Sequence, residues 1–347
     1  MNPPDHEDAP LAGARQQLID LSRAYLVSRS IHAVAELGVA DHVGDAPVEV
    51  EALARHTGTR PELLQRVLRL LAAYGVFEEA GAGRFGHTPL SRLLREDAEG
   101  SLRAGLRHVN GAWWAAAGDL LHSLRTGEPA FAHLHGAPMF SWLKDHPEQQ
   151  ERFDAGMANQ SRAGDQAVVD AYDFSGVLTF VDLGGGRGGL VRAILARYPE
   201  ARGTLFDQPQ VLARAPAPEG RFSHLAGDFF QAVPPGADAY LFKGVLHDFP
   251  DDRCVEILRA CRRAMGRASR LLLIERVPLP DNRPHPAKHL DVLMMILLAG
   301  QERSPEQWGA LLASAGLKLV RQIPTRSELT ILEAAPADAG PPEAATR

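Results

Sequence analysis

A glycine-rich segment follows an apolar run in the middle of the chain. Its sequence is TFVDLGGGRGGL, residues 179–190. Gly184, Gly186 and Gly189 match G-x-G-x-x-G, the loop that holds the pyrophosphate of a dinucleotide. Gly184, Gly186 and Gly188 also match G-x-G-x-G, which suggests methyl transfer instead of hydride transfer. Because glycine lets the backbone approach either ligand closely, the loop alone does not separate the two interpretations.

Carboxylates near the predicted strand ends do separate them. Asp207 ends the next apolar run, about 20 residues further on, where a carboxylate accepts the ribose hydroxyls of either ligand. Asp182 lies beside the loop, where it would repel a pyrophosphate but attract the cationic end of S-adenosylmethionine. Asp228 ends a third run and, with Phe229, is placed to contact an adenine, although Asp228 could also be a turn residue. The acids favour S-adenosylmethionine, bound by Asp182 and the loop glycines.

A histidine follows the fourth apolar run, in YLFKGVLHDFPDD. His247 is predicted at the carboxyl end of a strand, where ligands bind in parallel sheets. A neutral imidazole can take a proton from a hydroxyl near neutral pH. Adjacent residues at a strand end face opposite sides, so Asp248 is not predicted to pair with His247. It is predicted instead to favour the start of the next helix.

A catalytic imidazole needs a carboxylate on its other nitrogen. Glu275 ends the apolar strand LLLIERV, where burying an unused carboxylate would be costly. Glu302, in GQERSPEQW, precedes a helix and could equally be a surface acid. Both are candidate partners of the base.

Two other kinds of site are disfavoured. The chain lacks the G-x-S-x-G elbow of serine hydrolases. His285, His289 and Asp291 are spaced closely enough to suggest a metal site, but Pro286 is predicted to break a helix there. No metal is therefore predicted.

Alternating strands and helices must position these residues. They predict an α/β fold with a doubly wound, mostly parallel, Rossmann-like sheet over residues 176–335. The last two apolar segments, LKLVRQI and SELTILEA, predict an antiparallel hairpin. Residues 101–170 are predicted to be helical, with residues 127–142 as an interrupting loop.

The N-terminal third has a different pattern. Residues 11–100 predict a long helix, a helix–turn–helix and a small hairpin, which together make a winged helix. Winged helices often bind DNA, but the predicted recognition helix, TRPELLQRVLRLL, carries few basic residues. Dimerisation is at least as well favoured. Residues 1–10 and 336–347 are rich in Pro, Ala and acids, and they are predicted to be disordered.

Composition argues against several classes of protein. Of 347 residues, 45% are hydrophobic, and the net charge of -6 gives no overall attraction to nucleic acid or to an anionic membrane. No apolar run approaches the ~18 residues of a membrane span, and no signal peptide is recognisable. Cys254 and Cys261 fall on one predicted helix about 10 Å apart, too far for a disulfide. A cytoplasmic location is expected.

The motifs occur together in a recognisable order. The set FVDLGGGRGGL, LFDQPQV, GDFF, LFKGVLHDFPDD, LLLIERV and GQERS resembles the plant-type and bacterial small-molecule O-methyltransferases. That family includes caffeic acid and hydroxyindole methyltransferases and antibiotic-tailoring enzymes. The resemblance covers nearly the whole chain. It implies a homodimer, with a dimerisation domain over 11–100 and a catalytic domain over 101–335.

The resemblance also implies residue roles. His247 matches the general base, with Phe249 in place of the usual Trp, and Glu275 and Glu302 match the two acids beside it. The matches to cofactor and substrate ligands are Ser161 near the methionine carboxylate, Asp207 at the ribose, Asp228 and Phe229 at the adenine, Lys243 at the cofactor, and Phe153 and Met157 in the substrate pocket. The family's polar substrate ligand is replaced by apolar residues in MMILLAGQERS.

The sequence therefore predicts an S-adenosylmethionine-dependent O-methyltransferase. His247 takes the proton of a hydroxyl, phenolic in our interpretation, on a small-molecule natural product, and the oxygen attacks the methyl group in line. Three alternatives stay open: a family member that has turned to decarboxylation or hydroxylation, an NAD-dependent oxidoreductase, and a winged-helix transcription regulator. No nucleic-acid or membrane partner is predicted.

Overall fold

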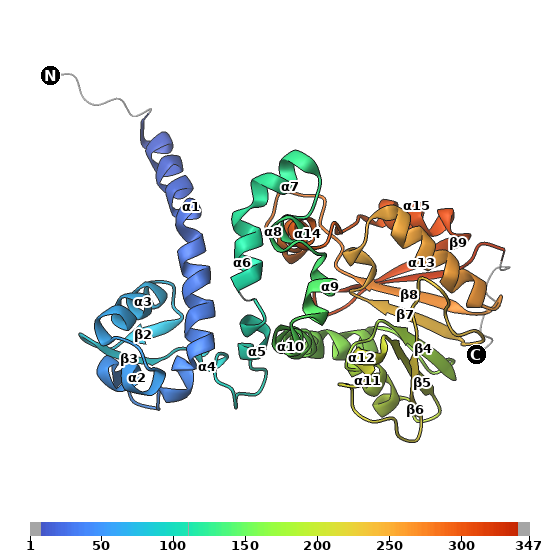
Figure 1. Cartoon of the computed structure of the whole chain (residues 1–347), viewed down its shortest axis with the longest axis horizontal. Helices are drawn as coiled ribbons and strands as arrows, with labels where there is room; N and C mark the ends of the chain where they lie inside the picture. The colour runs from blue at the N-terminus through green and yellow to red at the C-terminus, as the bar shows by residue number, and fades with distance from the viewer. Residues whose placement is uncertain (1–7, 110, 339–347) are drawn as a thin grey trace. The chain divides into compact units, whose positions relative to one another are not determined.

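The computed structural model describes residues 8–109 and 111–338. The chain divides into two compact units, Met1–Val109 and Asn110–Arg347 (Figure 1). Most of both tails predicted to be disordered lies outside the described residues. Residues 8–10 begin a helix and Pro336 ends a strand, so both tails were predicted too long. No helix among the described residues is long and apolar enough to cross a membrane.

The first unit contains a winged helix, as predicted. Its elements in chain order are α1 (Asp8–Leu37), η1 (Val39–His42), β1 (Val48–Glu49), α2 (Val50–Thr57), α3 (Pro61–Ala73), β2 (Phe77–Glu79), β3 (Arg84–His87), α4 (Pro89–Arg92) and α5 (Arg103–Arg107). The strands form an antiparallel sheet in the order β1-β3-β2. Proline at the first position of α3 suits a helix start, and one apolar face of α3 is buried.

The second unit carries the residues that the sequence singled out. Its helices are α6 (Gly111–Gly118), α7 (Leu120–Thr126), α8 (Ala130–His135), α9 (Met139–Lys144), α10 (Pro147–Ala171), α11 (Gly189–Arg197), α12 (Pro209–Leu212), η2 (Leu246–Asp248), α13 (Asp251–Ala264), α14 (Pro286–Leu297) and α15 (Pro305–Ser314). Its strands are β4 (Thr179–Leu183), β5 (Arg202–Asp207), β6 (Phe222–Ala226), β7 (Ala239–Lys243), β8 (Arg270–Glu275), β9 (Leu317–Pro324) and β10 (Thr330–Pro336).

The strands form one seven-stranded sheet in the order β6-β5-β4-β7-β8-β10-β9. Strands β4 to β8 are parallel, and β10 runs antiparallel to both of its neighbours. This confirms the predicted doubly wound sheet and its C-terminal hairpin. The strand order reverses between β4 and β7, which pair directly. Ligands bind at such a reversal, outside the carboxyl ends of the strands.

Two apolar layers cover the sheet. Helices α13 and α15 bury one set of side chains, which includes the free cysteines Cys254 and Cys261, and α10 and α11 bury another. Strands buried on both faces read as continuous apolar runs, which explains why β4, β7 and β8 were recognisable from sequence.

Two predicted elements were wrong. Residues 127–142 are not a loop, because α8 and α9 occupy most of them; each has six residues, too few for a periodic pattern, and each follows a proline. The fourth strand does not reach His247. Strand β7 ends at Lys243, where Gly244 takes a left-handed conformation with φ 59°.

Candidate active site

The reversal of strand order brings the glycine loop and His247 to the same edge of the sheet. The loop follows β4, and the segment that carries His247 follows β7, its neighbour. His247 lies in η2 and is buried, with 7% of its surface exposed.

Glu302 is the carboxylate that holds the imidazole. Its Oε1 lies 2.5 Å from Nδ1 of His247, and its side chain is 1% exposed. The backbone N–H of Glu302 donates to Oδ1 of Asp291 at 2.8 Å. Asp291 lies on α14, which Pro286 begins instead of breaking, so that prediction was wrong. With Nδ1 occupied by Glu302, Nε2 is the nitrogen that can accept a proton.

Asp248 faces the imidazole, contrary to prediction. Its Oδ1 lies 3.4 Å from Nε2 of His247. The two residues belong to a 3-10 turn, where the alternation of a strand does not apply. Burial acts to lower the pKa of His247, but the charges of Asp248, Glu302 and Glu275 outweigh it and raise that pKa to about 9. Burial also raises the pKa of Asp248 to about 6.

Glu275 acts on the imidazole differently from Glu302. It ends β8 and is 1% exposed, and neither carboxyl oxygen has a hydrogen-bond partner among the described residues. Burial raises its pKa to about 7. Glu275 therefore acts on the imidazole of His247 through its charge, whereas Glu302 is hydrogen-bonded to that imidazole.

The glycine loop is open at Gly186. Gly184, Gly186 and Gly188 have φ of 72°, 59° and 69°, conformations that favour glycine. A Cβ on Gly186 would meet nothing within 4 Å. The N–H of Gly186 donates to Oδ2 of Asp207 at 2.9 Å, which joins the loop to the end of β5. Burial raises the pKa of Asp207.

Asp182 lies beneath this loop and is 2% exposed. A Cβ on Gly185 would overlap its carboxylate, so the loop packs directly on it. Its Oδ1 has no hydrogen-bond partner among the described residues. Burial raises its pKa to about 7, although Lys243 acts in the opposite direction.

Lys243, at the end of β7, reaches helix α10. Its Nζ forms an ion pair with Asp165 and lies 3.4 Å from the carbonyl of Ser161. Sequence reasoning missed Asp165. It follows Ser161 by four residues, so helical spacing could have placed both on one face.

Asp228 and Phe229 follow β6. The carboxylate of Asp228 accepts the N–H of Phe230 at 2.9 Å, which is the turn role that the sequence left open. Phe229 lies in an aromatic cluster in which its ring centroid is 5.1 Å from that of Phe230 and 6.1 Å from that of Phe249.

Phe153 and Met157 are half-buried on α10. The ring of Phe153 lies 6.3 Å from that of Trp113 and 6.1 Å from that of Phe140. Helices α6, α9 and α10 thus share an aromatic contact region.

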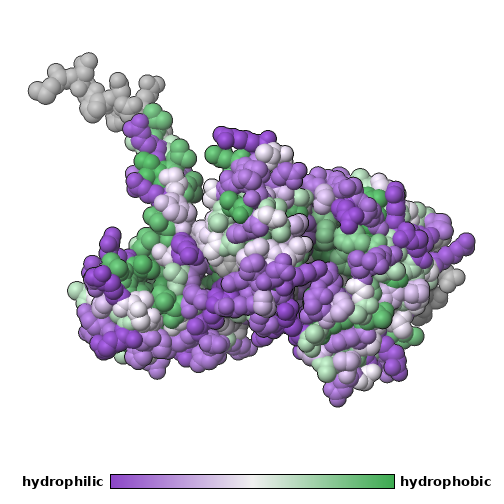
Figure 2. Space-filling view, viewed as in Figure 1, coloured by the Kyte–Doolittle hydropathy of each residue, from purple (hydrophilic) through white to green (hydrophobic). Residues whose placement is uncertain are grey.

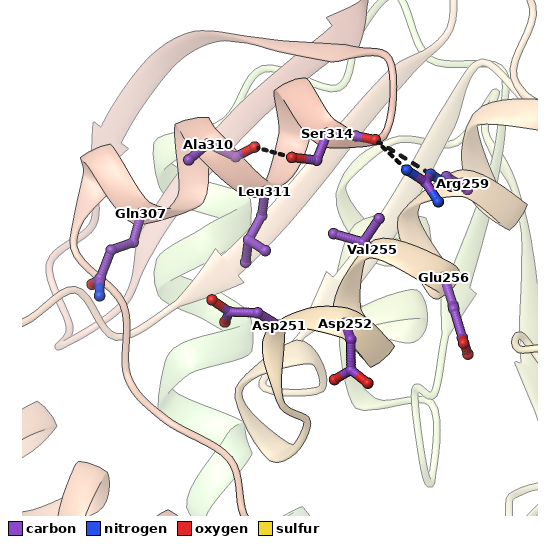
Figure 3. Close-up of a pocket in the computed structure, with 9 residues that line it drawn as sticks. All are labelled: Asp251, Asp252, Val255, Glu256, Arg259, Gln307, Ala310, Leu311 and Ser314. Carbon is purple, nitrogen blue, oxygen red and sulfur yellow. Dashed lines mark hydrogen bonds between the residues drawn. The ribbon is translucent and has the colours of Figure 1, made fainter.

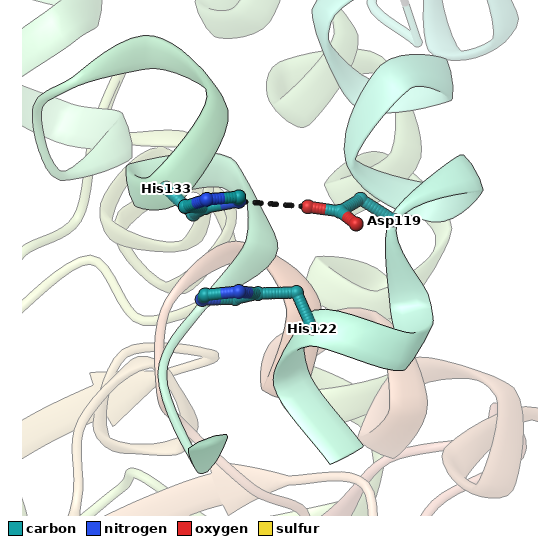
Figure 4. A group of neighbouring side chains, drawn as sticks. All are labelled: Asp119, His122 and His133. Carbon is teal, nitrogen blue, oxygen red and sulfur yellow. Dashed lines mark hydrogen bonds and ion pairs between the residues drawn. The ribbon is translucent and has the colours of Figure 1, made fainter. Parts of the chain in front are cut away.

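A separate group of titratable side chains lies outside this site: Asp119 directly before α7, His122 on α7 and His133 on α8. Nδ1 of His133 lies 2.9 Å from Oδ2 of Asp119, and the rings of His122 and His133 stack 3.8 Å apart with 4° between their planes (Figure 4). Parallel rings direct their nitrogen lone pairs side by side instead of toward one point. This differs from the convergent ligand geometry of a zinc site.

Comparison with known proteins agrees with this arrangement. Residues 114–318 match the model of the O-methyltransferase domain, and residues 19–97 match that of the O-methyltransferase dimerisation domain. The phenazine O-methyltransferase PhzM of Lysobacter antibioticus is 43% identical over 326 residues, which cover 92% of this chain and 95% of that protein. The chain belongs to the O-methyltransferase family.

Other relatives of this O-methyltransferase show the range of the family. The crystal structure of NcsB1 from neocarzinostatin biosynthesis, in complex with S-adenosylmethionine and 2-hydroxy-5-methyl naphthoic acid, has a TM-score of 0.77 and 30% identity, and covers 90% of this chain and 96% of its own. The 8-amino-8-demethylriboflavin N,N-dimethyltransferase of Streptomyces davaonensis is 33% identical over 341 residues, covering 95% of this chain and 98% of its own.

This O-methyltransferase depends on S-adenosylmethionine, and its residues fit that cofactor. The open side of Gly186 leaves room for a ligand above the loop. The unpartnered Oδ1 of Asp182 lies below the loop and suits a cationic ligand better than a pyrophosphate. This disfavours the NAD-dependent interpretation on structural grounds as well.

Proposed function

We propose that this O-methyltransferase methylates a phenolic hydroxyl of an aromatic natural product, with His247 as the general base. The observation that carries the proposal is the buried pair between Nδ1 of His247 and Glu302. That pair fixes one nitrogen, and Nε2, which lies 3.4 Å from Oδ1 of Asp248, is the nitrogen that would take the hydroxyl proton.

The chemistry of the proposed step is simple. S-adenosylmethionine supplies a methyl group on an already activated sulfonium. The enzyme has to align the hydroxyl with that carbon and remove its proton, so most of the acceleration comes from positioning. His247 must be neutral to act as a base. Its raised pKa, about 9, means that the rate increases with pH through the neutral range.

The proposed cofactor residues divide by the part of the ligand that they would meet. Asp207 would accept ribose hydroxyls, since its Oδ2 bonds only one loop N–H and has a further lone pair. Asp228 and Phe229 would meet the adenine. Asp182, Lys243 and Ser161 would face the methionine end, where Lys243 suits the carboxylate.

The proposed acceptor is flat and apolar. Phe153 and Met157 on α10 would contact it, and the aromatic rings around Phe153 suit stacking on an aromatic acceptor. The stretch before Glu302 is apolar, so acceptor choice would depend more on shape than on polar contacts.

The test uses purified enzyme and S-adenosylmethionine with a panel of acceptors: a hydroxyphenazine, 3-amino-4-hydroxybenzoate, 1,4-dihydroxy-2-naphthoic acid and the matching aryl amines. We expect O-methyl products, identified by mass spectrometry and NMR. His247→Gln should retain S-adenosylhomocysteine binding and lose about 10² to 10⁴ in rate. Methylation of amines alone, or wild-type turnover in His247→Gln, would contradict the proposal.

We also propose a homodimer formed by the dimerisation domain, over residues 11–100, with the catalytic domain over 101–335. Helix α1 exposes large apolar side chains to solvent, among them Leu18 at 69% and Leu21 at 65% (Figure 2). Such a surface is typical of an interface. Light scattering should give twice 37.6 kDa, and a monomer at micromolar concentration would refute this. A cytoplasmic location remains part of the proposal.

A further inference from the structure

Residues 300–303 lie directly against the segment that carries the base. The N–H of Gln301 donates to the carbonyl of His247 at 2.9 Å. A Cβ on Gly300 would overlap that same carbonyl, so glycine is needed for this approach. The preceding residue, Ala299, has φ 61°, a conformation that is rare for a residue with a side chain. Residues 299–301 thus pack closely against the backbone of His247, although the two segments are distant in sequence.

Arg303 binds the backbone on both sides of His247. Its Nη1 donates to the carbonyl of Leu246 at 3.3 Å, and its Nη2 donates to the carbonyl of Phe249 at 2.7 Å. Its Nε and Nη2 also donate to Oδ1 of Asp251, at 2.9 and 2.8 Å. One side chain therefore joins three points of the segment 246–251.

Arginine is suited to this position. Its side chain is 0% exposed, and its Cζ lies 5.1 Å from the ring centroid of Trp308. A planar guanidinium offers five donors in a fixed fork, which a lysine ammonium cannot reproduce. Asp251, in contrast, is 62% exposed and lies at a groove of 570 Å³ between α13 and α15 (Figure 3).

We propose that Arg303 is a positioning residue for the general base. It holds the 3-10 turn so that the imidazole stays on Glu302 and Nε2 faces the acceptor. This rests on the proposed role of His247. Because Glu302 and Arg303 are adjacent, one short segment fixes both the ring of the base and its backbone. A displacement of about 1 Å in such a group costs about 10²-fold in rate.

Three variants separate positioning from general stability. Arg303→Met removes the donors but keeps most of the side-chain length, and it leaves no buried unpaired charge, because Asp251 faces solvent. Arg303→Lys keeps the charge without the fork. Arg259→Met is the control for loss of an arginine at the surface: Arg259 joins α13 to the carbonyl of Ser314 in α15 and, among the described residues, makes no hydrogen bond or ion pair with residues 246–249.

The variants are assayed with the panel acceptor that the wild type methylates fastest. We expect Arg303→Met to lower kcat about 10²-fold while its Kd for S-adenosylhomocysteine stays within about threefold. Arg303→Lys should fall between it and the wild type, and Arg259→Met should stay within about twofold. The pH range over which kcat rises, the acidic limb of the pH profile, should move to lower pH in Arg303→Met. An imidazole displaced from Glu302 loses the interaction that raises its pKa.

A double-mutant cycle with His247→Gln decides the case. If Arg303 acts through the base, His247→Gln/Arg303→Met has the residual rate of His247→Gln alone. Independent, multiplicative losses would overturn the proposal, as would an Arg303→Met enzyme with a lower Tm but an unchanged kcat and pH profile. If Arg303→Met does not fold, the pH profile of kcat is measured for Arg303→Lys instead. An acidic limb moved to lower pH supports the proposal, and an unchanged limb overturns it. Wild-type turnover in His247→Gln is a different result, since it refutes the base itself.

Discussion

The two sides of the crevice are built in different ways. On the side of β4, β5 and β6, two acids accept backbone N–H groups: Asp207 those of Gly186 and Gln208, and Asp228 that of Phe230. On the side of β7 and β8, His247, the proposed base, is hydrogen-bonded to Glu302 from a distant segment, and the charges of Asp248, Glu302 and Glu275 raise its pKa.

We propose that the first side serves cofactor binding and that the second side serves the reaction. Asp207 and Asp228 can each be changed with a local effect, so we expect losses in cofactor affinity from these two changes. On the second side His247 is hydrogen-bonded to Glu302, so changing Glu302 is expected to alter the protonation or orientation of the proposed base, whereas Glu275 acts on His247 through its charge alone. We expect those changes to appear in kcat and in its pH dependence.

Of the variants that test this division between the two sides, Glu302→Gln is expected to have the largest effect on kcat. The variant keeps the volume of the side chain but no longer favours an imidazole with its proton on Nδ1, so kcat should fall about 10²-fold. Removing this charge should also move the acidic limb to lower pH. Steady-state kinetics measure both effects. A change confined to the KM of the cofactor would contradict the division between the two sides.

A smaller effect is expected from Asp207→Asn, on the other side. The Kd for S-adenosylhomocysteine should rise about 10-fold, as for loss of a hydrogen bond to a charged group, while kcat at saturating cofactor stays within about threefold. Calorimetry and kinetics check this. Asp173→Asn is the control, because Asp173 also accepts a backbone N–H, from Ser175, ahead of β4. Equal losses in both variants would mean that the effect is structural.

The smallest effect is expected from Glu275→Gln. Glu275 shares the buried surroundings of Glu302 but makes no hydrogen bond to another described residue. Its pKa is raised to about 7 by burial, so it is largely neutral below that pH. At pH 6 we therefore expect kcat within about threefold of the wild type. A loss as large as that of Glu302→Gln would show that both acids orient the base.

The placement of residues on the side of β4, β5 and β6 was easier to predict from the sequence than that of residues on the side of β7 and β8, for a physical reason. The glycine loop and Asp207 follow apolar strands, and neighbouring parallel strands end at the same edge. Their placement therefore depends on local pattern and on one topological rule. Helices α8 and α9 could not be predicted in this way, because helices of six residues have no periodicity to detect. The end of β7 at Lys243 was missed as well, because the apolar run continues past it.

The partners of His247 depend on local backbone geometry and on packing between distant segments. The pairing of Asp248 with His247 requires a 3-10 turn, which an apolar run does not signal. Asp291 and Arg303 meet the site through α14 and through the segment around Gly300, and no spacing in the sequence announces those contacts. The resemblance to O-methyltransferases named Glu302 as a partner of the base, but it gave no role to Arg303.

The central claim is that His247 accepts the proton. It is tested most directly by the pH dependence of single-turnover methyl transfer, measured with two panel acceptors whose phenols differ in pKa. Burial opposes protonation of His247, but its acidic neighbours raise its pKa to about 9, and a bound sulfonium lowers it by repulsion. The acidic limb of the wild type should therefore lie at or below pH 9 and be the same for both acceptors, whereas in His247→Gln it should follow the pKa of each phenol. A wild-type limb that follows the acceptor would contradict the account.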